Sequence, residues 1–349
     1  MKPPADNGNK KHGPAFWVSA VLKYVIPPVI TVGLCHLLLN ETDLSQMWHI
    51  ISTGCDFRWI VCALCLSVVS HIIRALRWRI QLNALDIKPG LWSLILSIFG
   101  TYAVNLVFPR LGELWRTGYI ARRTGSSFTE VFGSMVADRL ADTLTVLLLA
   151  AGAAVCSTTT FIDYISTDAE LAARLKGLVT GPWMYVAVAL FALGAWWFMR
   201  RPHGRKLEKV RQFIIGMWRG FAVLTRMKGR FRWLLLTAAL WGCYGLQLFL
   251  CFFAFDFTTA TVNAHGLLVP YVTFVLSSIS MGVPSNGGIG PWQYAVIFVL
   301  GAYGVATQDA SAFANLVLGT QTLLLIALGV FTFVCVFLQK KIQNNKLKL

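Results

Sequence analysis

Apolar runs dominate the chain from about residue 16 to residue 338, and short basic, glycine-rich or proline-rich segments separate them. A straight helical crossing of a bilayer needs about 20 apolar residues, with a range of about 17 to 25. Runs of that length are predicted to span a membrane, and there are six of them: 16–39, 57–80, 128–156, 183–199, 233–255 and 311–338. The pattern predicts an all-α, polytopic membrane protein.

Two further apolar regions are each interrupted by a break. The first consists of residues 91–108 and 111–121, joined through the letters FPRLG, and the second consists of residues 267–283 and 292–306, joined through GVPSNGGIGP. The pieces that follow the breaks are too short to cross a bilayer. We therefore predict two re-entrant helical hairpins, each of which returns to the side from which it enters.

The distribution of Lys and Arg fits this topology, because cytoplasmic loops of membrane proteins are enriched in positive charge. The topology gathers most of the 31 basic residues on one side and places acidic residues such as Asp56, Asp256 and Asp309 on the other. The basic segments are the N-terminus and residues 74–90, 109–130, 200–232 and 340–349. The prediction is a multi-pass protein of the cytoplasmic (inner) membrane with both termini in the cytoplasm.

Residues of about 14–156 and 180–338 then share the order helix, helix, hairpin, helix but start on opposite sides, which predicts an inverted repeat. Broken helices at corresponding positions of two halves are typical of a transporter's binding site, because their ends present free backbone groups. Two unrelated kinks in ordinary helices are the alternative. The expected organisation is one transmembrane domain, 16–338, between a polar tail at 1–15 and a basic tail at 339–349.

The composition agrees with a membrane protein and excludes several classes of function. Of 349 residues, 56% are hydrophobic and 13% are charged, whereas soluble domains have about 25% charged residues. The net charge is +16, but the basic residues are divided among membrane-flanking loops, which argues against nucleic-acid binding. The histidines and cysteines form no metal-binding pattern, so we expect no metal or other cofactor.

Three charged residues are predicted to lie deep in the membrane. The letters SFTE at 127–130 are typical of a capping box, which starts a helix near Phe128. At about 1.5 Å per residue, Asp138 and Asp142 lie roughly 15 and 21 Å along this helix, and Arg139 lies beside them. An isolated charge at the bilayer centre costs about 2.5 to 3.5 kcal/mol, so these three residues need partners or water.

The first hairpin supplies candidate partners for these charges. Arg110, Glu113 and Arg116 follow its break at i,i+3 spacing, so packing against the 128–156 helix would bring six charges together with a formal sum of zero. One interpretation is an ion-pair network that only fixes the hairpin, since buried ion pairs are weak evidence of function. The other is a polar cavity that takes a charged head group, which the position inside a broken-helix element favours.

The segment 200–232 carries eleven Lys or Arg residues and one Glu. Its apolar residues recur at steps of three and four, which predicts an amphipathic helix on the cytoplasmic leaflet that is attracted to anionic lipids. A topology signal alone explains these charges equally well.

Four motifs resemble those of a known family: RLGELWR at 110–116, ARRTG at 121–125, DRLAD at 138–142 and PSNGGIG at 284–290. The chain resembles flippase-like integral membrane proteins related to the transmembrane region of lysylphosphatidylglycerol synthase and to the membrane part of the archaeal dolichol-related protein AglD. The resemblance implies a bacterial or archaeal membrane protein that moves a lipid between leaflets. The soluble transferase domains of those relatives have no counterpart here.

Three positions depart from the family pattern. Leu111 stands where a proline is usual, Asp138 replaces a glutamate, and Gln293 stands where a glutamate commonly follows the glycines. Gln293 removes a charge from the second hairpin, which indicates a substrate different from that of the better-known members.

These observations predict a transporter and not an enzyme, moving an anionic or zwitterionic lipid or lipid-linked head group across the membrane. The expected partner is an anionic phospholipid or a polyprenyl-linked lipid. The arginines would contact phosphate, the acids would hold the arginines, and the glycines would let the backbone approach the substrate. The predicted substrate-binding residues are Arg110, Glu113, Arg116, Asp138, Arg139, Asp142, Asn286, Gly287, Gly288, Gly290 and Gln293.

Two other classes of function remain open. The first is a non-catalytic membrane partner of a lipid or glycan biosynthetic enzyme. The second is a membrane enzyme that modifies a lipid head group with the acids as general acid and base, although no serine, cysteine or histidine lies in a nucleophile-like context.

Overall fold

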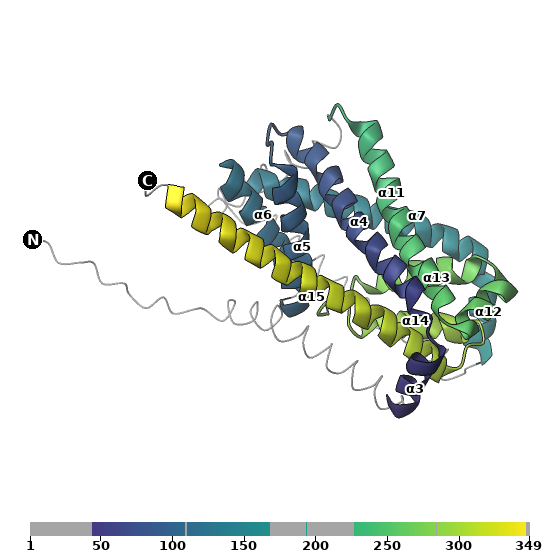
Figure 1. Ribbon diagram of the computed structural model, residues 1–349. Helices are drawn as coiled ribbons and strands as arrows, with labels where there is room; N and C mark the ends of the chain where they lie inside the picture. The colour runs from purple at the N-terminus through teal and green to yellow at the C-terminus, as the bar shows by residue number, and fades with distance from the viewer. Residues whose placement is uncertain (1–43, 109, 168–192, 194–226, 284, 347–349) are drawn as a thin grey trace, which may run out of the picture.

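The computed structural model describes residues 44–108, 110–167, 193, 227–283 and 285–346 (Figure 1). Its long helices are α4 (Phe57–Asn83), α7 (Phe128–Thr167), α11 (Arg230–Cys251) and α15 (Thr307–Lys346). Its shorter helices are α3 (Leu44–Gly54), α5 (Leu91–Val107), α6 (Leu111–Thr124), the 3-10 turn η1 (Phe252–Ala254), α12 (Asp256–His265), α13 (Leu268–Ser280) and α14 (Pro291–Ala302). The all-helical fold class predicted from the sequence is confirmed for this part of the chain.

Four of the described helices, α4, α7, α11 and α15, contain a stretch long and apolar enough to cross a membrane. The count rises to five if α12 and α13, which meet at 109°, form one broken span. The protein is therefore a multi-pass membrane protein. The predicted spans at 16–39 and 183–199 and nearly all of the basic segment 200–232 lie outside the described residues, so six spans stay a prediction.

The bundle has two chemically different ends. At one end the chain leaves α4, enters α11 and finishes α15, and this basic end carries Lys88, Lys228 and Arg230. At the other end α4 begins beside the end of α11, where Cys55 and Phe255 form a single β-bridge. Asp56, Asp256 and Asp309 lie at this acidic end.

A hydrophobic core lies toward each end of the bundle. At the acidic end, Phe252 and Phe255 of the α11–α12 region pack their rings against Phe313 of α15. At the basic end, Trp78 of α4 is buried with Leu94 of α5 and neighbouring side chains of α6 and α7. Each core joins segments far apart in the sequence, and the space between the cores is where polar residues gather.

The helices α5 and α6 form an antiparallel hairpin. The residue before a proline is biased toward extended backbone, and Phe108 adopts φ −126° and ψ 105°, which ends α5. The Asn105 side chain accepts a hydrogen bond from the Gly112 backbone N–H at 2.8 Å, so it caps the start of α6. A Cβ on Gly112 would contact the carbonyl oxygen of Thr101, so only glycine permits this close approach.

We expect Gly112→Ala to destabilise the hairpin by about 1 to 3 kcal/mol, the usual cost of forcing extra atoms into a packed site. Gly118→Ala on the same helix is the matched control, because its Cβ would meet only Phe128, at 4.0 Å. That change should be neutral or stabilise α6 by up to about 1 kcal/mol. Thermal unfolding of the detergent-purified variants measures both effects, and equal midpoints would contradict the close approach at Gly112.

The helices α13 and α14 form a second hairpin, and its outer ends meet where His265 and Tyr303 stack edge to face. The two hairpins make equivalent contacts with the long helices. In the first, α5 packs on α15 and α6 packs on α7; in the second, α13 packs on α7 and α14 packs on α15. Figure 1 shows α5 and α6 toward one end of the bundle and α12 to α14 toward the other.

Candidate functional site

A cavity of about 1030 Å³ lies between the two hairpins and the helices that are long and apolar enough to cross a membrane. Its volume is at the upper limit of ordinary ligand pockets, which measure about 300 to 1,000 Å³. The wall combines charged, uncharged polar and apolar side chains. Several apolar residues of the wall are exposed: Leu114, Leu147, Ile279, Met281 and Val283.

Two acids of α7 form the centre of an ion-pair network with arginines of α4. Arg77 Nη2 lies 2.6 Å from Asp138 Oδ1 and 2.8 Å from Asp142 Oδ1. Arg74 Nη1 lies 2.9 Å from Asp142 Oδ2 and 3.5 Å from Asp138 Oδ2. All four residues are buried, and the i,i+3 and i,i+4 spacings place each pair on one face of its helix.

Arg116 of α6 belongs to the same network but does not line the cavity. Its Nη2 lies 3.7 Å from Asp138 Oδ2, and its guanidinium carbon lies 4.5 Å from the centre of the Trp78 ring. Trp78 in turn donates a hydrogen bond from Nε1 to the hydroxyl of Ser134 at 3.1 Å. Arg116 and Asp138 are fully buried and do not line the cavity, so they would act on a ligand only through the residues that do.

A further ion pair lies on the cavity surface. Arg139 Nη2 is 2.5 Å from Glu113 Oε1, and Asn105 Nδ2 donates a hydrogen bond to Glu113 Oε2 at 3.2 Å. Arg139 Nη1 also lies 4.0 Å from Asp142 Oδ2. The Arg139 side chain is 36% exposed, so it is the cation of this network that a ligand reaches most easily.

We call these residues the buried charge cluster: Arg74, Arg77, Glu113, Arg116, Asp138, Arg139 and Asp142. The structure brings together five of the six charges that the sequence predicted to meet. Arg110 is the exception, because its guanidinium instead donates a hydrogen bond to the Gly282 carbonyl at 3.0 Å. The cluster has four cations and three anions, so the expected sum of zero is wrong and the sum is +1.

Arg74 and Arg77 were missed as site residues. Their position at the end of an apolar run, followed by Arg79 and Lys88, is typical of a topology signal. The helix α4 continues to Asn83, however, and this extension carries both arginines on the face that packs against α7. Their i,i+3 spacing indicates that they share one face of the helix, but it does not show what that face packs against.

The second hairpin reaches the cavity with its tip. Gly287 and Gly288 line the cavity with φ of 63° and 85°, backbone conformations that favour glycine. A Cβ on Gly287 would lie 2.6 Å from Leu106 Cδ2, so the tips of the two hairpins touch.

The other predicted residues of the second hairpin, Asn286, Gly290 and Gln293, are not part of the cavity wall. Gln293 accepts a hydrogen bond from the Gly290 backbone N–H at 2.9 Å and donates one to the side chain of Asn315 on α15. Gln293 therefore connects the tip of the hairpin to a long helix.

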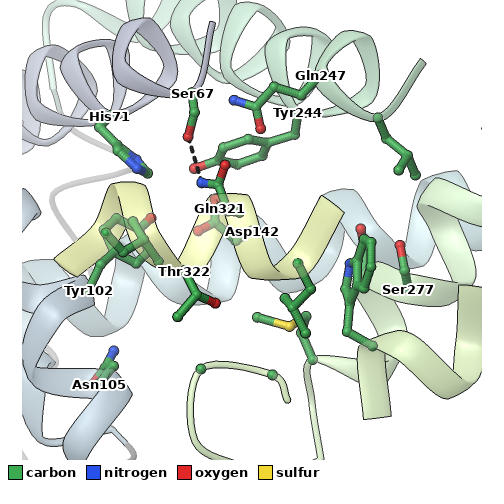
Figure 2. A pocket seen from close by; sticks show the side chains of 18 of the residues that line it. Ser67, His71, Tyr102, Asn105, Asp142, Tyr244, Gln247, Ser277, Gln321 and Thr322 are labelled. Carbon is green, nitrogen blue, oxygen red and sulfur yellow. Dashed lines mark hydrogen bonds between the residues drawn. The ribbon is translucent and has the colours of Figure 1, made fainter. Parts of the chain in front are cut away.

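The site residues predicted from the sequence therefore fall into two groups, those that line the cavity and those that do not. The predicted residues on the cavity wall are Arg110, Glu113, Arg139, Asp142, Gly287 and Gly288. Uncharged polar residues that the sequence did not single out also line it, and Figure 2 shows several of them: Ser67, His71, Tyr102, Tyr244, Gln247 and Gln321.

Comparisons with known proteins identify the family to which this arrangement belongs. No curated protein and no solved structure matches the chain. The model of the lysylphosphatidylglycerol synthase transmembrane region matches residues 24–329. That range contains every residue of the buried charge cluster and both hairpins, while the relation to AglD stays a prediction. The chain belongs to the family of the lysylphosphatidylglycerol synthase transmembrane region.

Proposed function

We propose that this protein is a lipid transporter that moves a lipid with an anionic head group between the two leaflets of the cytoplasmic membrane. The observation that carries the proposal is the cavity itself, which combines a charged wall with exposed apolar side chains inside a membrane bundle. A lipid in transit needs both surfaces, because its head group is polar and its tail stays in hydrocarbon.

The charge of the site supports an anionic head group. The buried charge cluster has an excess of one cation, and Arg139 and Arg74 reach the cavity surface. Guanidinium groups bind phosphate through planar, charge-assisted hydrogen bonds. The acids Glu113 and Asp142 keep these guanidinium groups in position, so they would not repel a phosphate as free carboxylates would.

The contacts of the hairpins support an inverted repeat. Each hairpin packs with its second helix on the long helix that follows it in the chain and with its first helix on the long helix of the other half. Two broken elements related in this way, with their tips at a cavity, are typical of transporters that alternate access around a fixed site.

We further propose that the basic end faces the cytoplasm and that both hairpins are re-entrant. In a cysteine-free background, Asp86→Cys and Arg122→Cys should both react with an impermeant maleimide from the cytoplasmic side. Asn263→Cys and Ala306→Cys, which flank the second hairpin, should react only from the opposite side. Labelling of Asp86→Cys and Arg122→Cys from opposite sides would overturn the re-entrant hairpin.

Reconstitution tests the proposed function against its alternatives. The purified full chain is placed in liposomes with fluorescent anionic phospholipids, and the leaflet distribution and the chemical identity of the lipids are followed. Exchange between leaflets with unchanged lipids supports transport. A change in lipid mass supports a head-group enzyme, and folded protein that does neither supports a partner of a biosynthetic enzyme.

A further inference from the structure

Uncharged polar side chains form a second surface of the same cavity, in addition to the charged surface of the buried charge cluster. We call this surface the polar belt, and it consists of Ser67, His71, Tyr102, Tyr244, Gln247 and Gln321. The residues come from α4, α5, α11 and α15, and Figure 2 shows Ser67, Tyr244, Gln247 and Gln321 converging on one region. Nothing in the proposed binding of phosphate uses them.

Part of the polar belt has hydrogen-bonding capacity that the described protein does not use. His71 is 3% exposed, and among the described residues neither of its ring nitrogens has a hydrogen-bond partner. The buried Nε2 of Gln247 likewise has no partner there. A buried polar group without a partner is costly, and more so inside a membrane. Two such groups on one cavity wall are therefore evidence for a polar ligand.

The polar belt adjoins the cationic wall. Arg74 Nε donates a hydrogen bond to the hydroxyl of Tyr244 at 3.2 Å, so Tyr244 connects the two surfaces. Gln321 Nε2 donates a hydrogen bond to the hydroxyl of Ser67 at 2.7 Å, which joins α15 to α4 across the belt. A phosphate at Arg74 and Arg139 would place the rest of its head group against these side chains.

The chemistry of the belt selects among head groups. Hydroxyl, amide and imidazole groups both donate and accept hydrogen bonds, as the hydroxyls of a polyol or sugar do. An ammonium head group needs a free carboxylate or an aromatic face. Both acids of the cavity wall are paired with arginines, so neither is a free carboxylate. The two tyrosine rings of the belt are also engaged, Tyr244 with the Arg74 guanidinium at 5.9 Å and Tyr102 with the His71 ring at 4.5 Å.

We infer that the transported lipid carries a hydroxyl-rich, uncharged polyol or sugar attached to its phosphate, which the polar belt recognises. This inference rests on the proposed transport function and narrows it to one class of lipid. The exposed apolar residues of the cavity wall would accommodate the start of the lipid tail.

The test compares acyl-labelled phosphatidylinositol, phosphatidic acid and phosphatidylethanolamine with matched chains in liposomes that contain the full-length protein. Phosphatidylinositol should change leaflets at least about tenfold faster than phosphatidic acid, because the latter has no hydroxyls beyond its phosphate. Gln247→Leu and His71→Leu should each bring the phosphatidylinositol rate down toward the phosphatidic acid rate.

Gln81→Leu is the matched control. Gln81 is 1% exposed, its side-chain amide also has no hydrogen-bond partner among the described residues, and it does not line the cavity. Removal of an unpartnered buried amide should leave the protein at least as heat-stable in both glutamine variants. Of the two glutamine variants, only Gln247→Leu should change the ratio of lipid rates.

The outcomes separate this inference from the function on which it rests. Equal rates for phosphatidylinositol and phosphatidic acid, a faster rate for phosphatidylethanolamine, or an unchanged ratio in both belt variants would overturn the polar belt as a recognition surface while transport stands. Folded protein that moves none of the three lipids would overturn the transport function itself.

Discussion

Asp138→Asn is expected to destabilise the protein by about 3 to 5 kcal/mol, the usual effect of removing one member of a buried ion pair. Asp138 is fully buried, and guanidinium nitrogens of Arg77, Arg74 and Arg116 lie 2.6, 3.5 and 3.7 Å from its carboxylate. Without that charge, the four cations of the cluster face two anions. Thermal unfolding of the detergent-purified protein and the yield of monodisperse protein measure the loss.

A second change should restore part of this stability. Asp138→Asn combined with Arg116→Gln returns the cluster to a net charge of +1, so the double variant should be more stable than Asp138→Asn alone. Asp56→Asn is the control: this residue forms an exposed pair with Arg58 and caps α4, and asparagine caps equally well. An Asp138→Asn protein as stable as Asp56→Asn would show that the buried charges are not coupled.

Arg139→Gln should lower the rate of anionic lipid translocation by at least about tenfold, because a hydrogen bond to a charged group contributes about 1.5 to 3 kcal/mol. Arg139 is the partly exposed cation of the buried charge cluster and lines the cavity, so its removal affects the ligand more than the core. Arg139→Lys should recover only part of the rate, since an ammonium group does not reproduce the planar pair of donors. The reconstituted translocation assay measures all three proteins.

Arg122→Gln removes the same charge from an exposed position at the basic end, away from the cavity. Its rate should match that of the wild type, which separates a local effect from a change in overall charge. If Arg139→Gln retains the full rate while the protein is folded, the charge cluster has a structural role only.

Local sequence signals were sufficient where the chain itself determines the geometry. The capping box at 127–130 predicts a helix start near Phe128, and α7 begins there. The proline at 109 predicts the end of the preceding helix, and α5 ends at Val107. In both cases the decisive interactions lie within a few residues along the chain.

Local sequence signals did not predict the features that depend on packing between helices or on weak local propensity. Arg74 and Arg77 belong to the charge cluster only because α4 packs against α7 and α11, which no spacing within α4 encodes. Helix α12 was also missed: its segment Asp256–His265 has ten residues and several β-branched ones, so propensity and periodicity are weak there.

The polar belt also could not be predicted from local sequence signals. Ser67, Tyr244 and Gln321 are uncharged polar residues within long apolar runs, where each is easily explained as a tolerated substitution. Only the packing of α4, α11 and α15 around one cavity brings them together. A search for polar residues within predicted spans would have found them without showing that they meet.

The most direct test of the central claim is to locate a lipid head group in the protein during transport. Two phospholipids, one with a diazirine on its head group and one with a diazirine in its tail, are photolysed with the reconstituted protein, and attachment sites are mapped by mass spectrometry. The head-group probe should attach to cavity-lining positions such as Thr143, and the tail probe to outward positions such as Leu148, which is 75% exposed. Attachment of the head-group probe only to loops at the basic end would contradict a transport cavity.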